Sequence, residues 1–156
     1  MEKHPIQQFI VHTLVKQALV FEEQSIEYYR RAAERITDEV SRKILLDLAD
    51  EEEKHKQHLE QFLSGNFHEI FEVHLSQEKL HLTIDSHYLH QQVDATWTEQ
   101  EILTLAITRE KASYNFYLLL AQKTKIHAAK QVFLYLAQAE KEHLHRLEQN
   151  QQTKPR

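Results

Sequence analysis

Apolar residues recur at steps of three and four along two stretches of the N-terminal half of the chain. The first stretch runs from about residue 5 to residue 36, and the second continues to residue 64. Such spacing places apolar side chains on one face of an α-helix. Pro5 suits the first turn of the first helix, and Thr37 and Asp38 offer an N-cap for the second. We expect the second helix to end at Gly65, the only glycine, in a left-handed C-cap.

The C-terminal half repeats this pattern. Thr98 and Glu101 have the spacing of a capping box, which opens a third helix, and a break near residues 123–126 separates it from a fourth. Residues 22–61 and 110–149 align without a gap and are identical at 12 of 40 positions. Duplication of a helical hairpin is the simplest explanation of this repeat.

Residues 65–97 separate the two hairpins and have no counterpart in the repeat. We interpret them as a connection with room for a short helix of its own. A link of roughly two to eight residues gives a simple up-down-up-down bundle, whereas a connection this long can return along the whole bundle. The sequence therefore predicts one all-α domain over residues 1–156, a ferritin-like four-helix bundle made of two repeated hairpins, 5–64 and 98–150, with a long crossover.

The composition agrees with this fold, because one glycine and two prolines leave little turn chemistry for a sheet. The net charge of −5 and the lack of a basic face argue against a nucleic-acid partner. No apolar run approaches membrane-spanning length and the first eight residues are too polar for a signal peptide, so we expect a cytoplasmic protein without a membrane partner. With no cysteine, these residues form neither a disulfide nor a cysteine-ligated iron site.

The candidate chemistry lies in a motif that occurs twice, 88 residues apart. Each copy has a lone glutamate on its first helix and a Glu-x-x-His step on its second. The six residues are Glu22, Glu52 and His55 in the first copy and Glu110, Glu140 and His143 in the second. The two glutamates of each copy lie 15 residues on either side of a predicted turn, at position 37 or 125. In an antiparallel hairpin, equal distance from the turn means equal depth along the bundle.

The four glutamates fall on largely apolar stripes, where an unpaired carboxylate carries a heavy desolvation cost. Four carboxylates that converge there repel one another unless they are protonated or bound to cations. Two divalent metals would bring four carboxylates and two neutral imidazoles to zero net charge, so the motif predicts a di-metal site. Carboxylate and imidazole ligands without thiolate suit iron or manganese.

Other acidic and histidine residues lack the repetition that supports the motif, and a single Glu-x-x-His step is common on solvated helix faces. We expect the non-repeated glutamates to lie on the surface; they are Glu23, Glu51, Glu53 and Glu142. We also expect His58 and His145, which are off register between the repeats, to be exposed. The histidines of the connection are predicted to be solvated; they are His68, His74, His81, His87 and His90.

Residues 18–29 and 48–55, together with their repeats, resemble the helices of rubrerythrin-type, ferritin-like di-iron carboxylate proteins. The resemblance implies that the six residues bind two iron ions, with Glu52 and Glu140 bridging them, Glu22 and Glu110 terminal, and one histidine for each ion. Tyr29 and Tyr117 match tyrosines that hydrogen-bond near the metals in this family. As an alternative, both could be ordinary core residues with a hydroxyl partner.

Two departures from that family are visible in the sequence. Ser113 stands where rubrerythrins carry an extra glutamate, and the cysteine-ligated rubredoxin domain is absent. The six-residue set also resembles that of bacterioferritin. The only methionine is Met1, however, so the methionine-ligated haem of that family has no candidate ligand.

Three functions remain open from the sequence. The leading hypothesis is a di-iron oxidoreductase that reduces peroxide or oxygen with electrons from a separate donor. The alternatives are a ferroxidase or iron-handling protein, and a metal-stabilised structural or interaction bundle without turnover. Manganese or a mixed metal pair could replace iron. Residues 116–120 are apolar or aromatic around more than one face of their helix, so we also expect a homodimer.

Overall fold

The computed structural model describes residues 4–65, 93–124 and 127–154. They form four α-helices, which are α1 (His4–Arg35), α2 (Glu39–Ser64), α4 (Glu99–Lys123) and α5 (His127–Gln152), and no strand occurs within these ranges. The predicted all-α bundle is therefore confirmed, with helix ends close to those expected. The histidines of the connection, and any short helix there, lie outside the described residues.

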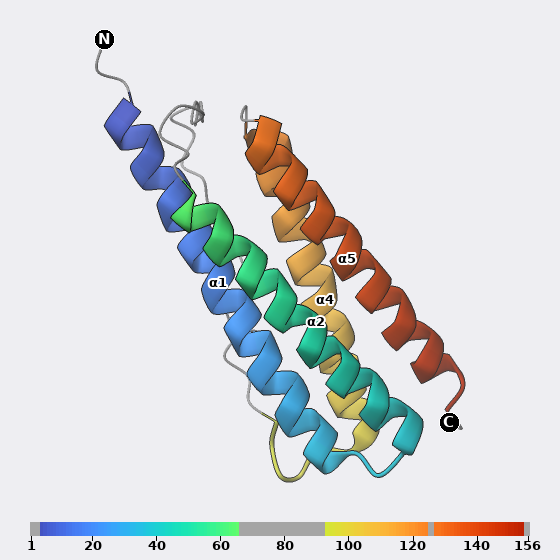
Figure 1. Ribbon diagram of the computed structural model, residues 1–156. Coiled ribbons are helices and arrows are strands. Elements are labelled where there is room, and N and C mark those ends of the chain that lie inside the picture. Colours follow the sequence, from blue (N-terminus) through green and yellow to red (C-terminus); the bar gives the residue numbers. More distant parts are fainter. Residues whose placement is uncertain (1–3, 66–92, 125–126, 155–156) are drawn as a thin grey trace.

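The helices pair as two hairpins, α1 with α2 and α4 with α5 (Figure 1). Helix α4 begins at the end of the bundle where α1 ends and α2 begins, whereas α2 ends at the opposite end (Figure 1). The chain between α2 and α4 therefore joins opposite ends of the bundle, as the predicted crossover requires. None of the described helices has the length and apolar character that crossing a bilayer demands.

The capping residues show how local sequence sets the helix ends. The side chain of Asp38 accepts the Ser41 N–H at 2.8 Å. Thr98 and Glu101 form both halves of the predicted capping box. The left-handed cap expected at Gly65 is wrong, since this residue has φ −66° and ψ 142° and is extended. Its N–H donates to the Gln61 carbonyl at 3.0 Å, so the helix end is satisfied without the conformation that favours glycine.

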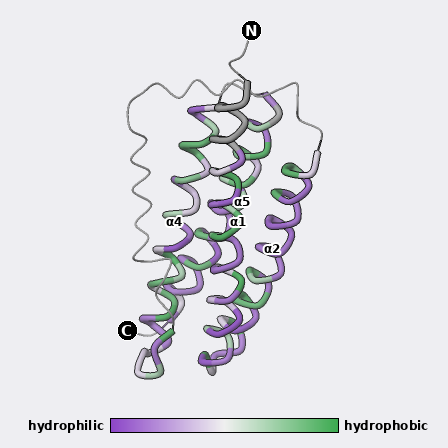
Figure 2. The backbone as a smooth tube through the Cα atoms, turned by 90° about the vertical axis from the view of Figure 1, so that its left-hand side faces the viewer, coloured by the Kyte–Doolittle hydropathy of each residue, from purple (hydrophilic) through white to green (hydrophobic). Residues whose placement is uncertain are grey.

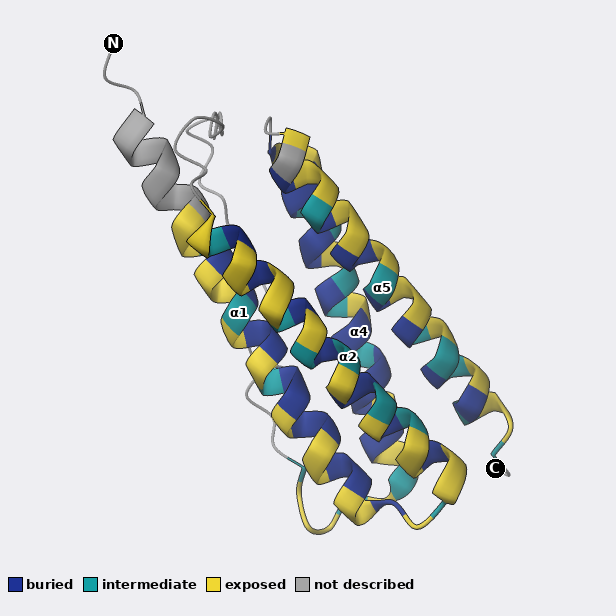
Figure 3. Cartoon of the chain, in the orientation of Figure 1, coloured by how far each residue is buried: buried dark blue, intermediate teal, exposed yellow. Residues whose placement is uncertain are grey.

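Each helix alternates hydrophobic and hydrophilic positions and turns its buried side towards the other three (Figures 2 and 3). The buried residues form two clusters at opposite ends of the bundle. We call the first the phenylalanine end; it comprises Val15, Ala18, Leu59, Phe62, Phe116, Tyr117, Leu120, Ala121, Ala129, Phe133, Leu136 and Ala137. The second, the tyrosine end, comprises Tyr28, Tyr29, Ala32, Ala33, Ile36, Leu45, Leu48, Ala49, Ile102, Leu103, Leu105, Ala106, Ile107 and Leu147.

The two ends are related by the sequence repeat. Nearly every residue of the phenylalanine end has its counterpart, 88 positions away, in the tyrosine end. The exceptions are Phe62 and Ala129, whose counterparts Asn150 and Ser41 are also buried. The Asn150 amide donates to the Ser41 hydroxyl at 2.7 Å, so this buried polar pair is satisfied. The duplication therefore gives the bundle an internal two-fold symmetry, with the repeated motif between its ends.

Candidate metal centre

All six residues of the repeated motif meet in the middle of the bundle. Glu22 comes from α1 and Glu110 from α4, while α2 and α5 each contribute one Glu-x-x-His step. None of the six is more than 3% exposed. They form two groups whose candidate ligand atoms lie within 4.8 Å of one another; these groups are Glu22, Glu52, His55 and Glu140, and Glu52, Glu110, Glu140 and His143. Equal spacing from the two turns has brought the residues to one depth, as the sequence predicts.

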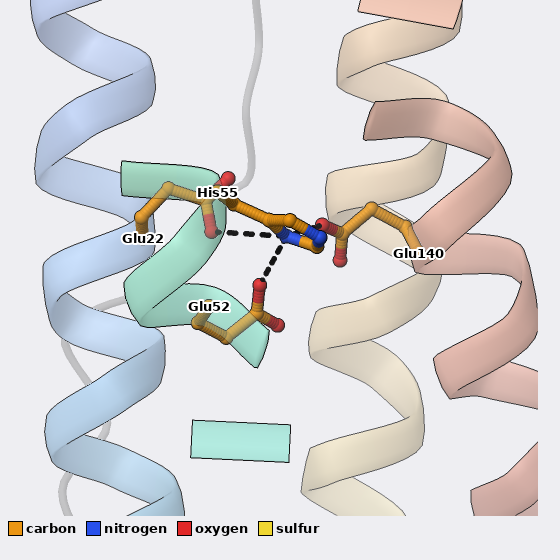
Figure 4. A group of neighbouring side chains, drawn as sticks. All are labelled: Glu22, Glu52, His55 and Glu140. Atoms are coloured by element: carbon orange, nitrogen blue, oxygen red, sulfur yellow. Dashed lines mark hydrogen bonds and ion pairs between the residues drawn. The ribbon is translucent and has the colours of Figure 1, made fainter. Parts of the chain in front are cut away.

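In the first group, the carboxylates surround one nitrogen of His55 (Figure 4). Its Nδ1 lies 2.7 Å from Glu52 Oε2, 3.3 Å from Glu140 Oε1 and 3.8 Å from Glu22 Oε2. The second group repeats this arrangement around His143. Its Nδ1 lies 3.2 Å from Glu52 Oε1, 3.4 Å from Glu110 Oε2 and 3.9 Å from Glu140 Oε2.

Glu52 and Glu140 belong to both groups. Each directs one carboxylate oxygen towards His55 and the other towards His143. The two imidazole rings stack, with their centroids 5.3 Å apart and their planes 14° apart. Two carboxylates thus span two neighbouring positions, each of which has its own histidine and its own lone glutamate.

Several potential metal-ligand atoms of this cluster have no hydrogen-bond partner, which suits the binding of cations. Among the described residues, Glu110 Oε2, Glu140 Oε1 and His143 Nδ1 are buried and make no hydrogen bond of acceptable geometry. Buried polar atoms are rarely left in this state. All three point into the cluster, and oxygen and imidazole nitrogen atoms are ligands that iron and manganese accept. The two buried clusters are therefore consistent with a di-metal site.

Tyr29 and Tyr117 contact the cluster, as the family resemblance implies. The Tyr29 hydroxyl donates to Glu110 Oε1, and the Tyr117 hydroxyl donates to Glu22 Oε1. Each tyrosine therefore bonds to the lone glutamate of the other hairpin, an exchange that follows the internal symmetry. Burial, together with the charge of Glu22, raises the pKa of Tyr117 well above its ordinary value, so this hydroxyl remains a donor.

Burial and mutual charge shift the proton affinities of the carboxylates. Burial, reinforced by the charge of Glu52, raises the pKa of Glu22 to about 8. Burial and the charges of Glu52 and Glu110 raise the pKa of Glu140 well above its ordinary value. Burial would also raise the pKa of Glu52, but the nearby imidazoles of His143 and His55 bring it well below its ordinary value.

The same carboxylates raise the pKa values of the two histidines, because they stabilise the positively charged imidazolium form. Burial disfavours the imidazolium form, yet the nearby carboxylates of Glu140, Glu22 and Glu52 raise the pKa of His55 to about 12. The pKa of His143 is also raised well above its ordinary value, despite burial, by its carboxylate neighbours. Without metal, protons therefore supply the positive charge that four converging carboxylates require.

The position of Glu51 differs from the one predicted from the sequence, which was on the surface. It is half-buried, and its Oε2 accepts the Nε2–H of His143 at 2.9 Å and the Nη2–H of Arg146 at 2.8 Å. The hydrogen bond with His143 is the main reason that the pKa of Glu51 falls to about 2. Repetition could not reveal this contact, because the counterpart of Glu51 in the second hairpin is Ala139. Glu23, His58 and His145 are exposed, as predicted.

Arg109 is a second residue whose position the sequence prediction missed. It is 1% exposed, its guanidinium lies 4.9 Å above the ring of Tyr28, and its Nη2 donates to the Ser25 hydroxyl at 3.2 Å. Burial lowers the pKa of Arg109 to about 10, at which it is still charged at neutral pH. A signal was present in the sequence, because Arg109 lies three residues after Ala106 and four before Ser113 on the buried stripe of α4.

The sequence matches a known family along most of its length. Residues 13–93 and 101–153 match the family model described as rubrerythrin. The chain belongs to the rubrerythrin family. Both copies of the motif lie within the matched ranges, so the resemblance stated from the sequence is confirmed. None of the 156 residues is a cysteine, so they contain no rubredoxin domain.

Comparison with solved structures agrees with this rubrerythrin-family fold. A hypothetical protein from Pyrococcus furiosus superimposes with a TM-score of 0.68 over 90% of this chain and 87% of that chain, at 24% sequence identity. This likeness shows the shared fold. No curated protein sequence matches the chain.

Proposed function

We propose that the protein is a di-iron oxidoreductase that reduces peroxide or oxygen with electrons from a separate donor. The observation that carries the proposal is the pair of shared carboxylates, Glu52 and Glu140, each with one oxygen directed to each histidine. Four carboxylates and two imidazoles so arranged can hold two cations side by side. Membership of the rubrerythrin family supports iron as the metal, and the ligand types suit iron or manganese.

The proposed ligand roles follow the two groups. Glu22 and His55 would hold one ion, Glu110 and His143 would hold the other, and Glu52 and Glu140 would be shared between the two ions. When bound, the two iron ions supply electrons and Lewis acidity to peroxide or oxygen.

The tyrosines orient the two lone glutamates. Each tyrosine hydroxyl donates to Oε1 of one lone glutamate, so that Oε2 of Glu22 and Oε2 of Glu110 are left facing the histidines. One oxygen from each lone glutamate is therefore available to a metal, while the other is fixed to the opposite hairpin. The apolar ends of the bundle separate the cluster from bulk water and strengthen its electrostatic interactions.

The test compares the wild type with Glu52→Ala and with a control, Glu23→Ala, at an exposed position next to Glu22. Each protein is loaded with ferrous ion without oxygen, its iron content is measured, and its oxidation by peroxide is followed by stopped-flow absorbance. We expect two irons per chain and fast oxidation in the wild type and the control. Glu52→Ala should lose both, because it removes a ligand from each metal position. If peroxide oxidised the iron of the wild type no faster than it oxidises free ferrous ion, the proposal would be wrong.

The other functions give different results in the same preparation. An iron-handling protein would oxidise ferrous ion with oxygen and pass it to a store, so sedimentation would find a large shell or a complex with one. The compact homodimer that we propose would argue against storage. A structural bundle would show stability that depends on metal but no redox turnover.

A further inference from the structure

The two histidines of the cluster differ at the ring nitrogen that points away from it. Nε2 of His143 donates to Glu51, a residue of the other hairpin, and Arg146 holds the same carboxylate oxygen. Since Glu51 comes from α2 and Arg146 from α5, this arrangement fixes the His143 ring between two helices. The other ring nitrogen, Nδ1, is directed into the cluster.

The equivalent flank of His55 has none of these charged partners. The repeat counterparts of Glu51 and Arg146 are Ala139 and His58. Among the described residues, no hydrogen bond reaches Nε2 of His55. Its ring instead makes a T-shaped contact with the ring of Tyr135, at 6.3 Å between centroids, and Tyr135 is 54% exposed. The ring of His58 contacts the same tyrosine at 5.4 Å.

This difference bears directly on metal binding. A carboxylate that accepts the outer N–H of a histidine ligand fixes its tautomer, orients the ring and makes the inner nitrogen more basic. Removal of such a partner from a metal site typically weakens metal binding about 10–100-fold. Glu51 supplies this support to His143, while Ala139 cannot supply it to His55.

We propose that Glu51 is a positioning residue that makes the two metal positions unequal. The position at His143 binds a divalent transition-metal ion more tightly and releases it more slowly, whereas the position at His55 is weaker and exchanges its ion. The chain can then hold one resident and one exchangeable ion, including a mixed pair. This inference rests on the two-metal site of the proposed function.

The experiment titrates the metal-free protein with cobalt(II) in the absence of oxygen, using calorimetry and the visible absorption of bound cobalt. We expect two binding steps whose dissociation constants differ at least about tenfold. Glu51→Gln should weaken the first step about 10–100-fold and leave the second nearly unchanged. The control, Glu53→Gln, lies beside Glu52 on the same helix and should leave both steps as in the wild type.

The repeat supplies a reciprocal variant. Ala139→Glu combined with His58→Arg places the missing charged pair beside His55 and should strengthen the second step, so that the two dissociation constants approach each other. This variant also decides the question if Glu51→Gln fails to fold, which far-ultraviolet circular dichroism would reveal. A role in folding alone would not move one binding step and spare the other.

The possible failures are distinct. Two equal steps in the wild type, or equal weakening of both steps by Glu51→Gln, would overturn the inequality and leave the two-metal site intact. Binding of fewer than two ions by the wild type would contradict the proposed function itself.

Discussion

Two pairs of buried side chains lie at equivalent positions of the repeat, on either side of the carboxylate cluster, but differ in chemistry. In this section we call these two regions the flanks of the cluster. On one flank Phe21 stacks on Phe116, with ring centroids 5.4 Å apart. On the other, the counterparts of these residues are Arg109 and Tyr28, which form a cation–π pair at 4.9 Å. The repeat therefore preserves the six candidate ligands and the packing around them while it lets the flanks diverge.

The difference shows what each kind of pair requires from its surroundings. Two stacked phenylalanines need only apolar neighbours, which both ends of the bundle provide. A buried guanidinium is stabilised only where polar or anionic groups replace its water. Ser25, the ring of Tyr28 and the charge of Glu52 provide this for Arg109. The Tyr28 hydroxyl is in turn satisfied by the Ile102 carbonyl at 2.6 Å.

Substitution of Phe21 and Arg109, each by the residue found at the other position, should produce the largest difference in the free energy of unfolding. Phe21→Arg places a cation in a flank without a matching pair and should cost about 3–5 kcal/mol in the free energy of unfolding. Arg109→Phe rebuilds an aromatic pair with Tyr28 and should be neutral or stabilising, since well-packed apolar groups often replace buried ions without loss. Urea denaturation of the metal-free variants measures both. Equal destabilisation by the two changes would show that the flanks are not distinguished by charge.

The pH dependence of metal binding should be the next largest effect. The raised pKa values of Glu22, about 8, and His55, about 12, mean that both hold protons at pH 7 in the metal-free protein. Metal must displace these protons, so its affinity rises with pH. The protons on Glu22 and His55 alone give at least about 100-fold per pH unit at this position below pH 8, and the His55 proton alone gives at least about tenfold above it.

Calorimetry in buffers of different ionisation enthalpy, repeated from pH 6 to 9, would count the protons released at each binding step. Comparison of the two steps also sharpens the contrast between the two metal positions. An affinity that is independent of pH would show that the carboxylates and histidines are not protonated in the metal-free state.

The two tyrosine contacts should give smaller and nearly equal effects, because the repeat conserves them. Tyr29→Phe and Tyr117→Phe each leave an oxygen of a buried glutamate without its partner, which should cost about 1–3 kcal/mol. Thermal denaturation of the metal-free proteins measures the loss, and Tyr114→Phe, at a half-buried position of α4, serves as the control. A much larger loss for one tyrosine than for the other would mean that the internal symmetry does not extend to these contacts.

Prediction from the sequence succeeded where helical geometry alone decides the outcome. Three-residue spacing puts Glu52 and His55 on one face, and equal distance from a turn puts Glu22 at the same depth. It failed at Gly65, because an extended residue closes the helix end as well as a left-handed one does. It also failed at Glu51, whose partners His143 and Arg146 come from a helix about 90 residues further along the chain.

Periodicity and counting along the chain were enough to predict four amphipathic helices, the repeat that pairs them, and the six residues that meet between them. Three features follow only from the folded structure: which oxygen of each glutamate faces which histidine, the exchange of tyrosine partners between hairpins, and the contact of Glu51 with His143 and Arg146. These features depend on contacts between hairpins. Side chains that are far apart in the sequence meet there, and their mutual charge and hydrogen bonding, rather than local propensity, fix their positions.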